Sequence, residues 1–248
     1  MKLKVLIIHL ARAAARLPTV ERLRRSTEYE CEIVEAIDGA HLSDEERTLR
    51  YRPKSCRPHY PFAMRDNEIG CFMSHRKAWR RIVESGLDAA LILEDDVEID
   101  PELFGPALKL ALTHCRRDSY VRFPVQDRET EQDVLAMKGG VRLYRPEVTG
   151  LGCHAQVVGV EAARRLIEVT GSFDRPVDSF LQMHWLSGVS AVSVRPSGTR
   201  EISKQIGGSN ISRKKAIWDT MYREVNRPLY RMQVRWLSKR SAAVRGVG

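Results

Sequence analysis

The 248-residue sequence predicts a protein of the α/β class, built on a Rossmann-like sheet that is flanked by helices. Two observations carry this prediction. The aliphatic runs KLKVLIIHL at residues 2–10 and AALIL at residues 89–93 resemble strands that are buried on both faces of a sheet. Segments with helical spacing alternate with these and other strand-like runs. Such alternation is typical of sheets that bind ligands beyond the carboxyl ends of their strands.

The start of the chain is predicted to form a β-α-β unit. After the first strand, residues 11–25 are rich in Ala, Leu and Arg and favour a helix that breaks or restarts at Pro18. Residues 31–36 (CEIVEA) follow as a second strand. Pro53, Pro58 and Pro61 then indicate an irregular loop.

A longer helix is predicted next, with Asp66 or Asn67 as its N-cap and Ser85-Gly86 at its end. The buried strand at residues 89–93 follows this helix. The remaining patterns are strand-like at residues 120–125, 141–144 and 155–160, and helical at residues 161–170 and 177–187.

Composition describes an ordinary globular enzyme, because 43% of the residues are hydrophobic and 29% are charged. The apolar run at residues 5–10 is far shorter than the roughly 20 residues that span a bilayer, and no cleavable leader pattern surrounds it. The five cysteines include no CxxC pair, which favours reduced thiols over a zinc or disulfide framework. These features predict a cytoplasmic protein.

The net charge of +9 is concentrated at the end of the chain, where residues 213–248 hold ten Lys or Arg and two acidic residues. Apolar residues recur between these cations at helical spacing, which predicts a basic amphipathic helix that Pro228 breaks or kinks. We therefore divide the chain into a catalytic domain at residues 1–212 and a basic extension at residues 213–248. For the extension we favour peripheral contact with an anionic membrane over docking on the body, and nucleic-acid binding lacks a recognised motif.

Three adjacent carboxylates, Glu94, Asp95 and Asp96, follow the strand at residues 89–93. The end of such a strand is where an α/β sheet collects ligands. A divalent cation would relieve the repulsion among these anions, and hard oxygen ligands suit Mg²⁺ or Mn²⁺ that is shared with substrate phosphates. We predict that Asp95 and Asp96 bind the metal, which would neutralise a leaving diphosphate. A solvated acidic turn is the structural alternative.

The stretch from residue 67 to 99, NEIGCFMSHRKAWRRIVESGLDAALILEDDVEI, closely resembles glycosyltransferase family 25, the lipooligosaccharide galactosyltransferase family. Members of this family show a GEIGC segment, then SH and W, then a hydrophobic strand that ends in LEDDV. The resemblance covers roughly the first 180 to 210 residues. The sequence departs from the family pattern at His9, where Asn is usual, and at Gln156, where Tyr is frequent.

The resemblance implies a GT-A-type fold and a nucleotide-sugar donor, with UDP-galactose as the expected one. It further implies an oligosaccharide or lipid-linked saccharide acceptor in lipopolysaccharide or related surface-glycan assembly, and Mn²⁺ or Mg²⁺ as cofactor. We expect donor binding from Glu94 and Asp95 and from three further residues: Arg12, Ser74 and His75. The alternative role for His75 is that of a hydrogen-bonded core histidine.

An inverting transfer needs a base that accepts the proton of the acceptor hydroxyl. Asp178 lies in a Pro-Val-Asp turn that resembles the acceptor side of the family, and it is our candidate; a helix N-cap is its alternative role. Arg12, Arg16, Arg76 and Lys204 are candidates for holding the diphosphate.

Two rival functions remain open. A metal-dependent phosphohydrolase or nuclease could use the acidic cluster, but it would need further carboxylates around the metal. A non-catalytic membrane- or nucleic-acid-binding module would not need an intact LEDDV segment.

Overall fold

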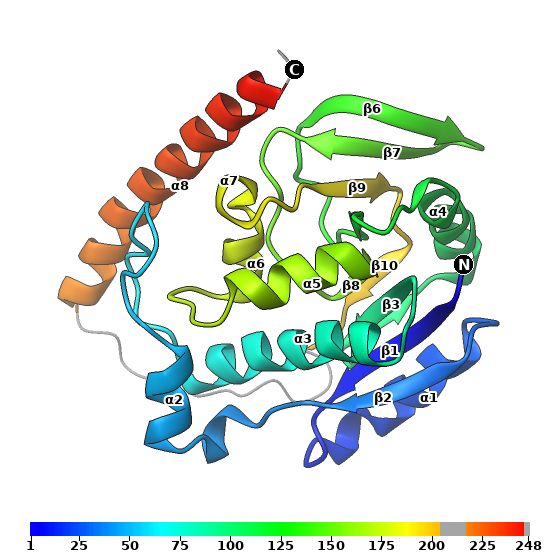
Figure 1. Ribbon diagram of the computed structural model, residues 1–248, viewed down its shortest axis with the longest axis horizontal. Helices are drawn as coiled ribbons and strands as arrows, with labels where there is room; N and C mark the ends of the chain where they lie inside the picture. Colours follow the sequence, from blue (N-terminus) through cyan, green and yellow to red (C-terminus); the bar gives the residue numbers. More distant parts are fainter. Residues whose placement is uncertain (204–216, 246–248) are drawn as a thin grey trace.

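The computed structural model describes residues 1–203 and 217–245, with side chains of the last helix described at residues 225–241. Its strands in the main sheet are β1 (Leu3–His9), β2 (Cys31–Glu35), β3 (Ala89–Glu94), β5 (Tyr120–Arg122), β6 (Glu131–Lys138), β7 (Val141–Pro146), β8 (Ala155–Gly159) and β9 (Ala191–Arg195). They are arranged in the order β2-β1-β3-β8-β5-β9-β7-β6 (Figure 1). A small second sheet pairs β4 (Val97–Ile99) with β10 (Thr199–Glu201).

Helices cover both faces of the main sheet. The helices in the described part of the chain are α1 (Leu17–Arg25), α2 (Asp44–Arg50), α3 (Asp66–Glu84), α4 (Pro101–His114), α5 (Val160–Val169), α6 (Val177–Leu181), α7 (His184–Ser187) and α8 (Ile217–Arg245), with 3-10 turns η1 (Ala14–Arg16) and η2 (Gly39–His41). The predicted α/β architecture with flanking helices and a basic C-terminal helix is confirmed.

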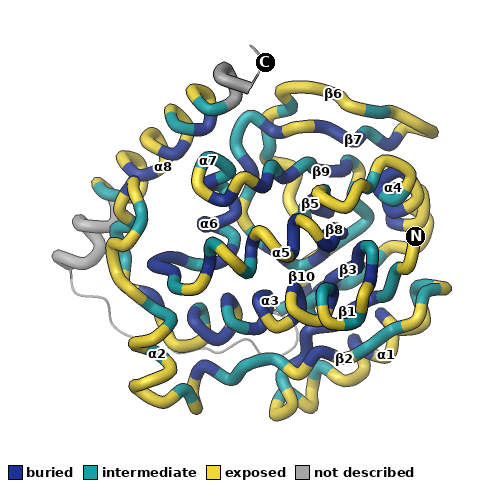
Figure 2. The backbone as a smooth tube through the Cα atoms, viewed as in Figure 1, coloured by how far each residue is buried: buried dark blue, intermediate teal, exposed yellow. Residues whose placement is uncertain are grey.

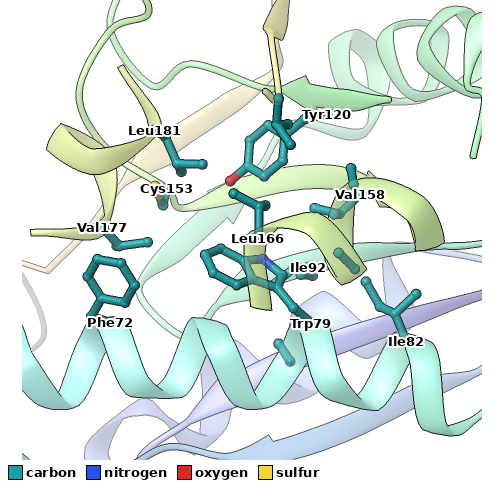
Figure 3. Packing of buried hydrophobic residues seen from close by; sticks show 14 of the residues in the cluster. Phe72, Trp79, Ile82, Ile92, Tyr120, Cys153, Val158, Leu166, Val177 and Leu181 are labelled. Carbon is teal, nitrogen blue, oxygen red and sulfur yellow. The ribbon is translucent and has the colours of Figure 1, made fainter. Parts of the chain in front are cut away.

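Successive residues of β1 face two different hydrophobic clusters. Leu6 and Ile8 pack with α3, α5 and α6, whereas Val5 and Ile7 pack with α1 and α4. Side chains in a strand alternate between the two faces of the sheet, so an uninterrupted aliphatic run buries both. Figure 3 shows the first cluster, in which Trp79 of α3 lies against Leu166 of α5.

The sheet is mixed rather than wholly parallel. β1 pairs in parallel with both β2 and β3, but β8 lies antiparallel to β3 and to β5. The carboxyl ends of β1, β2 and β3 therefore share one edge. The amino end of β8 meets them there, which brings residues from the middle of the chain to the same edge.

Several local predictions are confirmed and others need correction. A 3-10 turn precedes α1, and Pro18 lies in the first turn of that helix, where its missing N–H is no loss. The N-cap of α3 is Arg65, so Asp66 and Asn67 lie inside the helix. The helix expected over residues 177–187 is divided into α6 and α7, and α8 continues through Pro228 instead of breaking there.

Candidate functional site at the ends of β1, β2 and β3

A cavity of about 280 Å³ opens where β1, β2 and β3 end. Its walls come from the residues after each of these strands and from the first turns of α3. Parallel strands that end together leave their following loops in one crevice, which is where open α/β sheets bind ligands. All three carboxylates of the acidic cluster line this cavity.

Two glycines let α3 approach the loop after β2. A Cβ on Gly70 would lie 2.6 Å from the carbonyl oxygen of Ile37, and one on Gly39 would lie 1.9 Å from that of Asp66. The Ser74 hydroxyl completes this contact, because it accepts a hydrogen bond from the Ile37 amide at 2.7 Å and donates to the Gly70 carbonyl at 2.7 Å. Ser74 thus positions the backbone that borders the cavity.

Asp95 is buried and both of its carboxylate oxygens have partners. Oδ2 lies 2.7 Å from Nδ1 of His9 and 3.3 Å from the Leu10 amide, and Oδ1 lies 2.5 Å from Nη1 of Arg16. His9 therefore has a structural role in this chain at the position where the family pattern has Asn. These contacts connect the turn after β3 with the end of β1.

Glu94 is held by a chain of buried side chains. The Gln156 amide nitrogen, which can only donate, lies 3.0 Å from His75 Nδ1, so His75 carries its proton on Nε2 and donates it to Glu94 Oε1 at 2.8 Å. The Tyr120 hydroxyl donates to the Gln156 carbonyl oxygen. Burial opposes ionisation of Glu94, but the hydrogen bond from His75 and the nearby His154 and Arg16 lower its pKa.

Asp96 differs from both neighbours because its Oδ1 atom is buried and has no hydrogen-bond partner among the described residues. Its other oxygen lies 3.3 Å from Nη1 of Arg16. Burial and the negative charge of Glu94 raise the pKa of Asp96, and Arg16 only partly opposes this shift. A cation at this carboxylate would remove that penalty.

Two groups of side chains in the described part of the chain lie close enough to share a metal ion. One contains Glu94, Asp96 and His154, the other Cys71, His75 and Glu94, and the ligand atoms in each lie within 4.8 Å of one another. Both groups include a residue of the predicted acidic cluster. His154 was missed by sequence analysis, since it precedes β8 and its position beside Glu94 depends on the pairing of β8 with β3.

The basic candidates occupy different places. Arg16 bridges Asp95 and Asp96 inside the cavity, and Arg12 lies at its rim, where its ion pair with Asp38 lowers the pKa of that carboxyl to about 2. Arg76 is buried elsewhere and donates to the Ile167 carbonyl. Lys204 lies outside the described residues.

Asp178 lies in the first turn of α6, whose N-cap is Pro176. Its oxygens accept hydrogen bonds from the Gly152 amide at 3.0 Å and the Ser179 amide at 2.6 Å. Burial, and then the charges of Asp178 and Glu94, raise the pKa of the Cys153 thiol. Asp178 is not among the residues that line the cavity.

The C-terminal helix α8 packs on the body with one side only (Figure 2). Tyr230, Val234 and Ser238 are buried, and the buried Arg175 donates a hydrogen bond to the Tyr230 hydroxyl at 2.9 Å. The opposite side exposes an apolar stripe made of Val225, Leu229, Met232 and Trp236. The described part of the extension is thus docked on the body, which the sequence analysis gave as the alternative to membrane contact. The boundary predicted at residue 212 lies outside the described residues. Among those residues, no helix has the length and apolar character needed to cross a membrane.

Comparison with known proteins assigns this architecture to a family. Residues 2–181 match the family model described as "Glycosyltransferase family 25 (LPS biosynthesis protein)". A "Glycosyltransferase 25 family member" of Drosophila melanogaster is 38% identical over 101 residues, which are 40% of this chain and 16% of that relative. "Procollagen galactosyltransferase 1" of Danio rerio is 31% identical over 158 residues, which are 62% of this chain and 24% of that relative.

The chain thus spans a quarter or less of the length of these two relatives. Among solved structures, a glycosyltransferase involved in glycosylation of the major capsid of PBCV-1 is similar, with a TM-score of 0.42 and 10% identity. That similarity covers 91% of this chain and all of the other chain.

Proposed function

Because the chain belongs to glycosyltransferase family 25, we propose that it transfers galactose from UDP-galactose to a saccharide acceptor, with inversion at the anomeric carbon. The observation that carries this proposal is the cavity at the ends of β1, β2 and β3, which combines a carboxylate cluster with the cationic Arg16. The name of the family model, which refers to LPS biosynthesis, supports a lipopolysaccharide or related surface glycan as the acceptor. The relative named a procollagen galactosyltransferase supports galactose as the sugar.

The donor is proposed to lie in this cavity with its diphosphate near Asp96. Arg16 is the cation best placed to hold that diphosphate, because it already contacts the carboxylates and about a quarter of its side chain, 26%, is exposed. Arg12 at the rim is a second contact. Ser74 and His75 act on the donor indirectly, through the backbone at Ile37 and the carboxylate of Glu94.

The residues at this site fit a divalent cation, since Asp96 offers a carboxylate whose Oδ1 atom is buried and has no partner within the described part of the chain. Bound Mn²⁺ or Mg²⁺ would neutralise charge on the departing UDP. Asp178 is proposed to accept the proton from the attacking acceptor hydroxyl. Asp95 is proposed to support the donor site by ordering the turn through its hydrogen bonds with His9 and Arg16.

A panel of nucleotide sugars tests the function directly. Purified full-length protein is incubated with radiolabelled UDP-galactose, UDP-glucose, UDP-N-acetylglucosamine and GDP-mannose, with oligosaccharide acceptors and with Mn²⁺, Mg²⁺ or EDTA. We expect transfer from UDP-galactose that EDTA abolishes. Transfer that persists in EDTA would refute the proposed metal dependence. Transfer from a different sugar nucleotide would refute UDP-galactose as the donor. If phosphodiester hydrolysis alone is observed, the rival phosphohydrolase replaces the proposal.

We further propose that the apolar stripe of α8 rests on an anionic membrane surface that carries the acceptor. Arg231 and Arg240 lie on the exposed part of the helix, and the Arg240 guanidinium lies 5.3 Å from the centre of the Trp236 ring. Aromatic residues next to cations are typical of helices that lie in the membrane interface. Nucleic-acid binding is the competing use of this charge and is an outcome of the same test.

Removing the two cations should weaken sedimentation with phosphatidylserine vesicles by about 30-fold, since each basic residue contributes about 1 kcal/mol at such a surface. The variant is Arg231→Gln with Arg240→Gln. Its matched control is Arg24→Gln with Arg25→Gln, two exposed arginines of α1, which should sediment as the parent does. Equal sedimentation of both variants would refute the membrane contact, and binding to DNA but not to vesicles would favour the competing reading.

A further inference from the structure

We propose that Glu94, Asp96 and His154 together form the divalent-cation site, and that the imidazole of His154 makes this site select Mn²⁺ over Mg²⁺. The inference deepens the proposed function and rests on the acidic turn being its metal site. It assigns to His154 a role that the sequence did not indicate.

The pairing of β3 with β8 brings His154 to the acidic turn. Leu93 of β3 is opposite Ala155 of β8, so Glu94 after the one strand meets His154 before the other. The Glu94 amide donates to the His154 carbonyl at 2.8 Å, which holds the two backbones together. The ligand atoms of Glu94, Asp96 and His154 lie within 4.8 Å of one another as a result.

The atoms of Glu94 and Asp96 that do not already accept a hydrogen bond are the ones available to bind a metal ion. Glu94 Oε1 accepts from His75, which leaves Oε2 toward His154, 3.9 Å from its Nε2 atom. That separation is too long for a hydrogen bond, so Glu94 Oε2 and His154 Nε2 do not bond to each other directly. Asp96 contributes Oδ1, which is buried and has no partner among the described residues.

Asp95 is a poorer ligand than its neighbours. Its two oxygens already accept hydrogen bonds from His9, the Leu10 amide and Arg16. Coordination by Asp95 would break contacts that hold the end of β1 to the turn. The same criterion favours His154 over His75, because both ring nitrogens of His75 are occupied by Gln156 and Glu94.

A nitrogen ligand changes which ion the site prefers. Mg²⁺ is bound through oxygen ligands and retains several waters, whereas imidazole is a good ligand for transition-metal ions. The two carboxylates balance the charge of a divalent ion. The neutral imidazole adds a nitrogen ligand that Mn²⁺ accepts more readily than Mg²⁺ does. Affinity should increase further for Co²⁺, which stands above Mn²⁺ in the order for nitrogen-containing sites.

Electron spin-echo envelope modulation of bound Mn²⁺ tests this ligand set without any turnover. Full-length protein is loaded with Mn²⁺ alone and with Mn²⁺ plus UDP. We expect nitrogen modulation from a directly coordinated imidazole in the parent protein, and its loss in His154→Ala. The Kd for Mn²⁺ should increase at least tenfold, roughly the least that even removing an outer partner of a metal ligand costs. The Kd for Mg²⁺, measured by competition, should change less.

Two further variants keep the result interpretable. His114→Ala removes an exposed histidine at the end of α4 and should retain the full nitrogen signal. His154→Asn covers the case in which His154→Ala fails to fold, because the amide oxygen preserves a ligand but the modulation from imidazole must still disappear. Bound Mn²⁺ without nitrogen modulation in the parent protein, or with unchanged modulation in both His154 variants, would overturn the proposal.

The measurement separates this inference from the proposed function. If the nitrogen signal depends on His154 but no sugar nucleotide is used, the metal site stands and the proposed function fails. If UDP-galactose is used and the signal does not depend on His154, the function stands and the ligand set is wrong.

Discussion

Replacing Asp96 with Asn is expected to lower sugar transfer at least about 100-fold while the protein stays folded. Asn has nearly the same shape, but it lacks the charge with which Asp96 would hold a cation on the leaving diphosphate. Electrophilic stabilisation by a metal contributes several kcal/mol, and a loss of about 3 kcal/mol corresponds to about 100-fold in rate. The measurement is kcat/KM for transfer from UDP-galactose at increasing Mn²⁺.

Stability should move in the opposite direction to activity in this variant. Burial and the charge of Glu94 raise the pKa of Asp96, so the ionised Asp96 carboxylate is less stable in the folded state than in the unfolded chain. The unfavourable contribution is absent below the unfolded-state pKa, grows between the two pKa values and is complete above the folded-state pKa of about 6. At neutral pH, Asp96→Asn should therefore have a Tm equal to or above that of the parent, which excludes unfolding as the cause of lost activity.

Asp178→Asn is the contrasting variant. We expect it to lower kcat while Mn²⁺ and UDP bind as in the parent, because a base is needed only when the acceptor hydroxyl attacks. Asp96→Asn should lose Mn²⁺ binding as well as turnover. Normal transfer by Asp96→Asn at saturating Mn²⁺ would exclude a metal-binding role for Asp96. Lost UDP binding with normal turnover in Asp178→Asn would exclude Asp178 as the catalytic base.

Replacing Arg175 with Leu is expected to lower the free energy of unfolding by about 3–5 kcal/mol. Arg175 is fully buried and forms a two-point ion pair with Asp174, at 2.6 Å and 3.0 Å. It also donates to the carbonyl oxygens of Cys56 and Pro58 and to the Tyr230 hydroxyl. The substitution would leave a carboxylate buried without its counter-charge, which costs more than the ion pair itself contributes.

Urea denaturation measures this effect, and an exposed pair supplies its control. Arg117→Leu removes an arginine that contacts Asp88 and Glu161 at the surface, and should cost at most about 1 kcal/mol. The double variant Asp174→Asn with Arg175→Leu should recover part of the loss, since no charge remains buried. Equal destabilisation by Arg175→Leu and Arg117→Leu would show that the buried pair does not hold the loop at residues 51–61 and α8 on the body.

The exposed and buried sides of α8 illustrate how much a sequence pattern can predict. Helical spacing predicted the helix, but it did not show which apolar residues pack on the body. Tyr230 and Val234 are buried, whereas Met232 and Trp236 are exposed. Contacts that hold this helix on the body come from residues far from it in the sequence, such as Arg175 with Tyr230 and Glu147 with Ser238.

The sequence by itself determined the strands that border the acidic turn. β1 and β3 are buried on both faces, so each appears in the sequence as a continuous aliphatic run. It also placed Glu94 and Asp96 at the end of β3, where sheets of this class collect ligands. It did not reveal β6, whose residues are largely exposed and lack a strand-like alternation, so that pairing with β7 decides its structure.

Only the tertiary structure decided the partners of the three carboxylates. Asp95 accepts hydrogen bonds from His9 and Arg16, Glu94 accepts one from His75, and Asp96 has one oxygen without a partner among the described residues. These neighbours are contributed by segments far apart in the chain. His9 lies beside the turn because β1 pairs with β3, and His154 lies there because β8 runs antiparallel to β3. Local periodicity records which face of an element is buried, but it carries no information about which distant strand will be its neighbour.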